Sequence, residues 1–238
     1  MYILTMLRVT LMTLTDCAYR VSEASVRFTK AFPPDIMHDV LEGVLPLVMK
    51  LVITEARKQR HITIREFNDG LKELSFGKNY VTNKPVPLTD ISLQKSIVGS
   101  ASQKWCLFRL LPILMAHRVP PGCAYWNVYL LSREIVEIIF ASQIRKDDLS
   151  YLKICIEDFL TELTNVFGNV LTPKCHYLIH YPRLIAMYGP LSLLWCMRYE
   201  SKHQYFKEIS KNGKNFVNIT HTAPVISLNS AGSFLLFY

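Results

Sequence analysis

The sequence has no closely spaced cysteine pair, no long apolar run and no clear export signal. Its 6 cysteines lie far apart, and no two follow a Cys-x-x-Cys pattern. This spacing argues against a zinc ribbon or a compact disulfide scaffold and is typical of thiols in a reducing compartment. No segment offers about eighteen uninterrupted apolar residues, so we expect a soluble protein without a membrane-spanning helix. Arg8 interrupts the apolar N-terminal stretch, so we expect a nuclear or cytoplasmic protein that is not secreted.

Acidic side chains are also in the minority. The 238 residues include 27 lysines and arginines against 19 aspartates and glutamates, which gives a net charge of +8 and a pI of about 9.2. A basic balance favours a polyanionic partner such as DNA. The excess is greatest between Asn169 and Asn215, where seven basic residues face two glutamates. A nucleic-acid surface is therefore expected in that third of the chain, although lysines that only solvate a helix face would give the same pattern.

Apolar residues recur at helical spacing over most of the chain. Half of the residues are hydrophobic, enough to bury a substantial core in one or two domains. The segment 35–58 contains Pro46, which predicts either a kinked helix or two short ones. Thr63 and Glu66 have capping-box spacing, and Gly168 follows a periodic segment as a helix-ending glycine does. We expect helices at about 35–58, 63–77, 92–117, 125–142 and 147–167.

These helices predict a mainly α fold, with a bundle-like domain over residues 32–214. Residues 1–31 form a poorly defined segment, in which alternating apolar residues and threonines favour one or two short strands. Residues 215–238 are polar and small, and they predict an irregular tail. The chain has no internal repeat of solenoid length and no low-complexity tract.

A cluster of acidic residues follows the double proline Pro33-Pro34. Asp35, His38, Asp39 and Glu42 fall on neighbouring positions of one or two helical turns, because residues three and four apart face the same way. The cluster has a structural interpretation, in which Asp35 caps the helix, its carboxylate holds the imidazole of His38, and the acids complement the helix dipole. It also has a chemical one, because carboxylates and an imidazole are metal ligands.

Two histidines lie near the end of the helical region. His176 and His180 are four residues apart and would share one helix face, a geometry that can hold a metal ion. No glutamate of a His-Glu-x-x-His motif lies between them, and no third ligand is evident. Packing histidines flanked by aromatic residues are the alternative interpretation.

Three motifs together resemble a known family. The first is Phe32-Pro-Pro-Asp-Ile-Met-His-Asp-Val-Leu-Glu-Gly43, and the second is Leu171-Thr-Pro-Lys-Cys-His-Tyr-Leu-Ile-His-Tyr-Pro182. The third begins at Gly189-Pro-Leu and continues as Leu194-Trp-Cys-Met-Arg-Tyr-Glu-Ser-Lys-His-Gln-Tyr-Phe-Lys207. In this order they resemble transposon-derived proteins whose parent is the CACTA (En/Spm-type) DNA transposase. The resemblance spans about residues 32–214.

The resemblance implies an RNase H-like catalytic domain that carries two aspartates and a glutamate. Asp35 and His38 fill the Asp-x-x-His signature that lies downstream of the second catalytic aspartate in that superfamily. Trp195, Met197 and Tyr199 match the approach to the catalytic glutamate, so the resemblance makes Glu200 its vestigial candidate. An intact relative would use Mg²⁺ or Mn²⁺, because two-metal phosphodiester cleavage needs several carboxylates.

The upstream part of the family pattern is not matched in this sequence. Only Asp16 precedes the first motif, and its context, Leu14-Thr-Asp-Cys-Ala, does not fit that of a catalytic aspartate. The upstream cysteine pair of the family is also missing. We therefore expect a remnant of the helical insertion of such a transposase, with no enzymatic activity on its own and no cofactor.

Three functions follow from these observations. The first is a transposase remnant that contacts DNA phosphates without sequence specificity. The second is a helical protein interaction module with no nucleic-acid role, which binds a second copy of itself or an intact transposase. The third is a metal-dependent hydrolase built from the acidic cluster and the two histidines. The residues expected to bind nucleic acid in the first reading are Arg198, Lys202, Lys207, Lys211 and Lys214.

Overall fold

The structure is a computed structural model that describes residues 34–77, 83–89, 96–197 and 199. Contacts between Cα atoms divide the chain into two units, Met1–Pro34 and Asp35–Tyr238, and all elements below belong to the second. The strands expected in residues 1–30 and the tail expected in 215–238 lie outside the described residues. Within the described ranges every regular element is a helix and there is no strand, which confirms the prediction of a mainly α fold.

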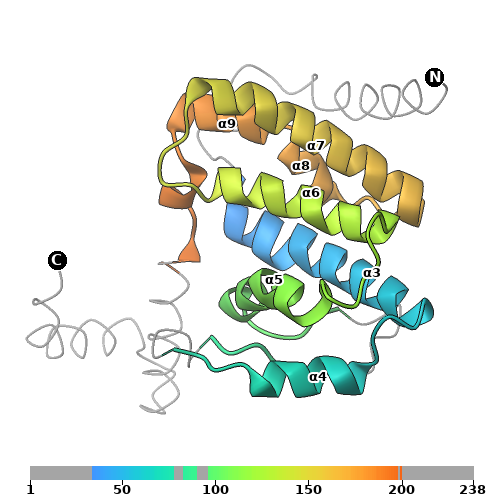
Figure 1. Ribbon diagram of the computed structural model, residues 1–238. Helices are drawn as coiled ribbons and strands as arrows, with labels where there is room; N and C mark the ends of the chain where they lie inside the picture. Colours follow the sequence, from blue (N-terminus) through green and yellow to red (C-terminus); the bar gives the residue numbers. More distant parts are fainter. Residues whose placement is uncertain (1–33, 78–82, 90–95, 198, 200–238) are drawn as a thin grey trace, which may run out of the picture. The chain divides into compact units, whose positions relative to one another are not determined.

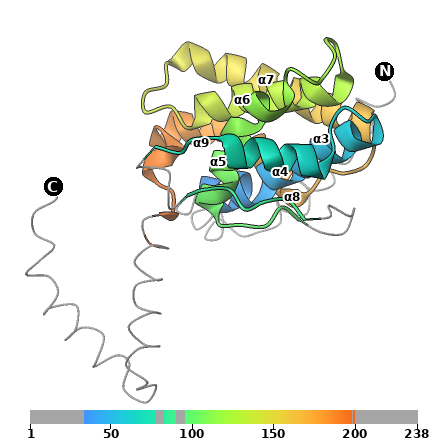
Figure 2. The ribbon, with the colours of Figure 1, turned by 60° about the horizontal axis from the view of Figure 1, so that its bottom comes forward.

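The helices form a layered arrangement around α3. The elements are the π-helix η1 (Met37–Val44), α3 (Leu45–Lys58), α4 (Ile64–Glu73), α5 (Ala101–Met115), α6 (Ala124–Ile139), α7 (Lys146–Phe167), α8 (Pro173–Leu178), α9 (Tyr181–Tyr188) and the 3-10 helix η3 (Leu191–Leu193). Figure 1 shows a succession from α7 through α6, α3 and α5 to α4, and successive members of this series are in contact. Helices α6 and α7 have the most extensive contact, and Figure 2 shows them side by side from a second direction.

The segment that contains Pro46 is a π-helix continued by an α-helix. The backbone N–H of Leu45 donates to the carbonyl of Val40, five residues back, as in a π-helix. Pro46 has no N–H to donate and is the second residue of α3, directly after this change of hydrogen bonding. The sequence correctly predicted that this segment is not one regular α-helix. The irregularity is a change from π-helical to α-helical hydrogen bonding beside Pro46.

Capping residues decide where α4 and α5 begin. Thr63 and Glu66 form the predicted capping box at α4, with each side chain accepting from the backbone N–H of the other. The predicted helix 92–117 is wrong at its start, because residues 96–100 are not helical and α5 begins at Ala101. Ser100 and Gln103 form a second capping box there, which fixes this start.

The core lies between the helices and is largely aromatic and aliphatic. Its fully buried aromatic side chains come from five helices and are Phe67, Phe108, Tyr125, Tyr129, Phe159 and Tyr181. Tyr129 donates its hydroxyl to the carbonyl of Phe108 at 2.9 Å, and burial raises its pKa to about 12, so the hydroxyl stays a donor. None of the helices in the described ranges is both long and apolar enough to cross a membrane.

Candidate functional site

The carboxylate of Asp35 joins the first motif to the third. Its Oδ1 accepts from the backbone N–H of Cys196 at 2.9 Å, and its Oδ2 accepts from the Cys196 thiol at 2.9 Å. The same Oδ2 lies 3.2 Å from the backbone nitrogen of His38 and 2.7 Å from its Nδ1. The capping contact and the contact with the imidazole are those that the sequence predicts for Asp35. The contact with Cys196, 161 positions away in the chain, was not predicted.

These contacts keep Asp35 ionised. Partial burial raises the pKa of this carboxyl, but the hydrogen bonds from Cys196 and His38 outweigh it, and the net pKa lies below the usual range. The carboxylate thus has a backbone N–H, a thiol and an imidazole within hydrogen-bond distance. Asp35 therefore acts as an anchor between two distant parts of the chain.

Helix α8 and the start of α9 connect the second motif to the first. Lys174 donates its Nζ to the carbonyl of His38 at 2.8 Å, and the hydroxyl of Tyr181 donates to Oδ2 of Asp39 at 3.3 Å. Asp39 is 7 % exposed. Burial raises its pKa, and the Tyr181 hydrogen bond and the Lys174 charge offset part of this rise. All three motifs thus meet around the beginning of η1.

The absence of a side chain at Gly43 allows α8 to approach η1 closely. A Cβ placed there would lie 2.3 Å from Cδ and 3.2 Å from Cβ of Lys174, and 3.3 Å from the carbonyl oxygen of His38. Lys174 could avoid such a Cβ only by moving, which would disturb its hydrogen bond with His38. Gly43 therefore belongs to the contact between the first and second motifs.

Replacing Gly43 with alanine is expected to lower the free energy of unfolding by about 1–2 kcal/mol, because of this overpacking. Gly70 of α4 is the matched control, because its added Cβ would meet only the flexible end of Leu114, at 3.3 Å. The Gly70→Ala variant should be unchanged or more stable by up to about 1 kcal/mol, since alanine is the better helix former. Urea denaturation followed by circular dichroism measures the free energy of unfolding of both variants. Equal effects of the two variants would contradict the role given to Gly43.

Trp195 anchors the approach to Glu200 on the helical core. Its ring packs edge-on against Phe140 with centroids 5.7 Å apart, and Phe140 stacks on Trp105 of α5 at 4.8 Å. The hydroxyl of Ser102 lies 3.9 Å from the sulfur of Met197. Trp195, predicted from the family motif, thus has a packing role in the fold.

His176 and His180 lie close together but not on one helix face as predicted, because His176 belongs to α8 and His180 is the residue before α9, and they do not join the acidic cluster. Their Nε2 atoms are 3.1 Å apart, and desolvation together with the charges of His176 and Arg183 lowers the pKa of His180. Among the described residues, the one group of three or more possible metal ligands is Asp35, His38 and Cys196, whose ligand atoms lie within 4.8 Å of one another. The hydrolase site considered from the sequence, which needs the acidic cluster and both histidines together, is not found in this part of the chain.

Several predicted site residues lie outside the described residues. These are the vestigial catalytic candidate Glu200 and the five expected DNA contacts Arg198, Lys202, Lys207, Lys211 and Lys214. Conversely, sequence reasoning missed the roles of Cys196, Lys174 and Tyr181. All three lie inside the quoted motifs, so the available signal was their position in a motif and not their chemistry.

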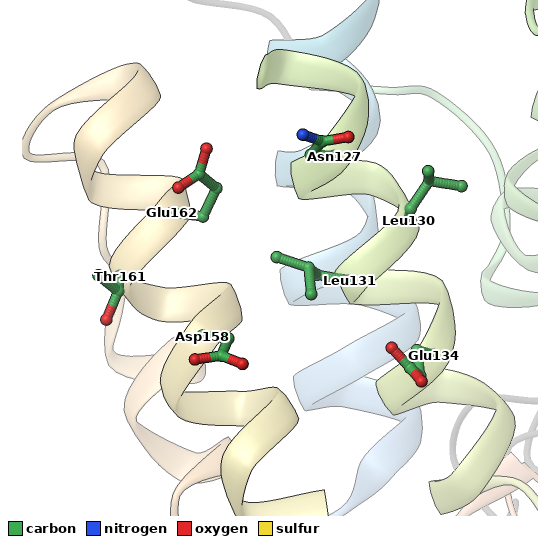
Figure 3. Close-up of a pocket in the computed structure, with 7 residues that line it drawn as sticks. All are labelled: Asn127, Leu130, Leu131, Glu134, Asp158, Thr161 and Glu162. Atoms are coloured by element: carbon green, nitrogen blue, oxygen red, sulfur yellow. The ribbon is translucent and has the colours of Figure 1, made fainter. Parts of the chain in front are cut away.

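The helices α6 and α7 border a pocket of about 510 Å³ (Figure 3). Leu131 points from α6 into the gap, and Asp158 and Glu162 point toward it from α7. Glu134 completes an acidic border, and the hydroxyl of Tyr151 donates to its carboxylate. No residue of the three motifs lines this pocket.

Family models, curated proteins and solved structures gave no match to the chain. The resemblance to CACTA transposases therefore depends on the three motifs, and descent from that family stays a proposal.

Proposed function

We propose that this chain is a CACTA transposase-derived domain that binds DNA and does not cleave it on its own. The observation that supports this best is that the first motif of the resemblance contacts both of the others, which are far away in the sequence. Asp35 and His38 of the first motif contact Cys196 of the third, and Lys174 of the second contacts His38. Motifs that define a single ancestral site are expected to lie together in space.

The position of these contacts fits such an origin. Cys196 lies four residues before Glu200, so the first motif holds the segment that leads to the vestigial catalytic glutamate. In an intact relative this would help to position the glutamate relative to the segment that follows the second aspartate. The proposed role of the Asp-x-x-His motif here is therefore structural positioning.

The surroundings of Asp35 and Asp39 support DNA binding without cleavage. Two-metal cleavage requires several carboxylates whose oxygens are available to Mg²⁺ or Mn²⁺. Asp35 lies beside a thiol and an imidazole, a donor set that does not suit Mg²⁺ or Mn²⁺, and Asp39 is buried against Tyr181. We derive no metal-dependent step for these residues.

The proposed DNA contacts come from the basic residues that surround Glu200 in the sequence. If the five side chains Arg198, Lys202, Lys207, Lys211 and Lys214 each neutralise one phosphate, the logarithm of the association constant should fall with the logarithm of salt concentration with a slope of about −4.5. A fourfold rise in salt would then weaken binding about 500-fold. Fluorescence anisotropy with a labelled duplex of arbitrary sequence measures this slope.

Two variants that each remove five positive charges test which basic residues bind DNA. Replacing the five residues with glutamine should bring the slope close to zero. The control replaces one arginine and four lysines that are exposed elsewhere, namely Arg65, Lys58, Lys72, Lys146 and Lys153, and should retain most of the slope. Absent or salt-insensitive binding by the native chain, or equal losses in both variants, would contradict the proposal and favour the helical interaction module. Incubation of the native chain with duplex DNA and Mg²⁺ or Mn²⁺ should give no cleavage of the DNA.

A further inference from the structure

Three different ligand atoms converge at the junction of the first and third motifs. Oδ2 of Asp35 lies 2.7 Å from Nδ1 of His38 and 2.9 Å from Sγ of Cys196, and the sulfur lies 3.4 Å from the same Nδ1. We propose that Asp35, His38 and Cys196 are three ligands of a zinc site. This inference does not rest on the proposed DNA binding.

The spacing of the three atoms suits a tetrahedral ion. Ligand atoms bound to zinc at about 2.0–2.3 Å and at tetrahedral angles lie about 3.3–3.7 Å from one another. The Cys196 to His38 distance of 3.4 Å already falls in this range. The two distances from Asp35 are shorter, as expected when hydrogen bonds hold the three groups together, and this carboxylate would have to move outward by about half an ångström.

The same geometry argues against a nucleophilic cysteine. In a catalytic relay the acid and the nucleophile contact opposite nitrogens of the histidine ring. Here both the Asp35 oxygen and the Cys196 sulfur face Nδ1. The three atoms therefore surround a common point and do not form a chain for proton transfer.

The donor set selects the metal. A thiolate, an imidazole nitrogen and a carboxylate oxygen suit Zn²⁺, whereas Mg²⁺ and Ca²⁺ prefer sites made of oxygen atoms. The other ring nitrogen of His38 lies 4.0 Å from Oε2 of Glu42, which is too long for a hydrogen bond. The second oxygen of Asp35 is fixed by the backbone N–H of Cys196.

The site is open to ions from solution. The side chain of His38 is 47 % exposed, and Cys196 is half-buried. Zinc would bind the sulfur of Cys196 as a thiolate, with release of the thiol proton to solvent. A bound ion would link the start of η1 to the segment that follows η3.

Cobalt substitution tests the site, because Co²⁺ bound to a thiolate absorbs in the near ultraviolet and tetrahedral Co²⁺ gives intense visible bands. Titration of the full chain with Co²⁺ should saturate at one equivalent, and Zn²⁺ should displace the cobalt. The Cys196→Ser variant should lose the charge-transfer band, and its Zn²⁺ affinity in competition with a chromogenic chelator should fall by at least about tenfold.

Two controls separate this site from other thiols and imidazoles. The Cys123→Ser variant alters a half-buried cysteine at the start of α6, and the double variant His176→Gln/His180→Gln removes the neighbouring imidazole pair. Both should retain the cobalt spectrum. If Cys196→Ser loses its helical circular dichroism, His38→Gln, at an exposed position, takes its place and should weaken the visible bands and the Zn²⁺ affinity. An unchanged spectrum in the folded site variant, its loss in either control, or no cobalt band in the native chain would overturn the proposal.

Discussion

Replacement of Asp35 with alanine is expected to lower the free energy of unfolding by about 3 kcal/mol. Loss of a helix cap costs about 1 kcal/mol. The half-buried backbone N–H of Cys196 would also lose its acceptor, which costs about 1–3 kcal/mol. The imidazole of His38 loses its contact at 2.7 Å as well. Urea denaturation with linear extrapolation measures the change.

Two substitutions control for simple charge removal. Asp35→Asn keeps one oxygen as an acceptor, so the loss should be smaller, about 1 kcal/mol. Glu42→Ala removes a neighbouring carboxylate whose nearest basic atom in this cluster, Nε2 of His38, is 4.0 Å away, and should change stability by less than about 0.5 kcal/mol. An equal effect of Asp35→Ala and Glu42→Ala would show that Asp35 does not anchor the third motif.

Replacement of Tyr181 with alanine is expected to cost about 4 kcal/mol, within the usual range for deleting a buried aromatic ring. The side chain is fully buried and belongs to the hydrophobic core, and its hydroxyl donates to Asp39 at 3.3 Å. Tyr181→Phe keeps the ring but leaves Asp39 without this donor, and should cost about 1–2 kcal/mol. The difference in free energy of unfolding between the Tyr181→Ala and Tyr181→Phe variants gives the contribution of ring packing.

Tyr177 is the matched control for Tyr181. It lies in the same motif, four residues earlier, and is 40 % exposed. Tyr177→Ala should therefore cost less than about 1 kcal/mol in the same denaturation experiment. A loss as large as that of Tyr181→Ala would mean that the second motif packs differently from the structure described above.

The helices were predictable because local signals specify them. The Thr63 capping box, the periodicity of 147–167 and the terminal Gly168 each act within a few residues, and the start of α4 and both ends of α7 lie close to where these signals indicate. The predicted end of α4 at residue 77 is wrong, because the helix ends at Glu73 and Leu74 is extended. The start of α5 was missed although its signal is local as well. Ser100 and Gln103 have capping-box spacing, but the helix was extended upstream through Gly99, which adopts a φ of 130°.

The site could be predicted only in part, because it combines local and distant contacts. The hydrogen bonds between Asp35 and His38 follow from a spacing of three residues. The contacts of Asp35 with Cys196 and of Asp39 with Tyr181 depend on how the helices pack, which no short segment specifies. The family resemblance selected the three segments that meet but gave no reason to single out Cys196.

The separation of 161 positions between Asp35 and Cys196 has a consequence for biosynthesis. At about 5–20 residues per second, a ribosome needs roughly 10 to 30 seconds after adding the aspartate before it adds the cysteine. For most of that interval the nascent η1 helix has neither its thiol partner nor the lysine and tyrosine of the second motif. The junction of the three motifs is therefore completed late in translation, after the helices from α3 to α7 have been synthesised.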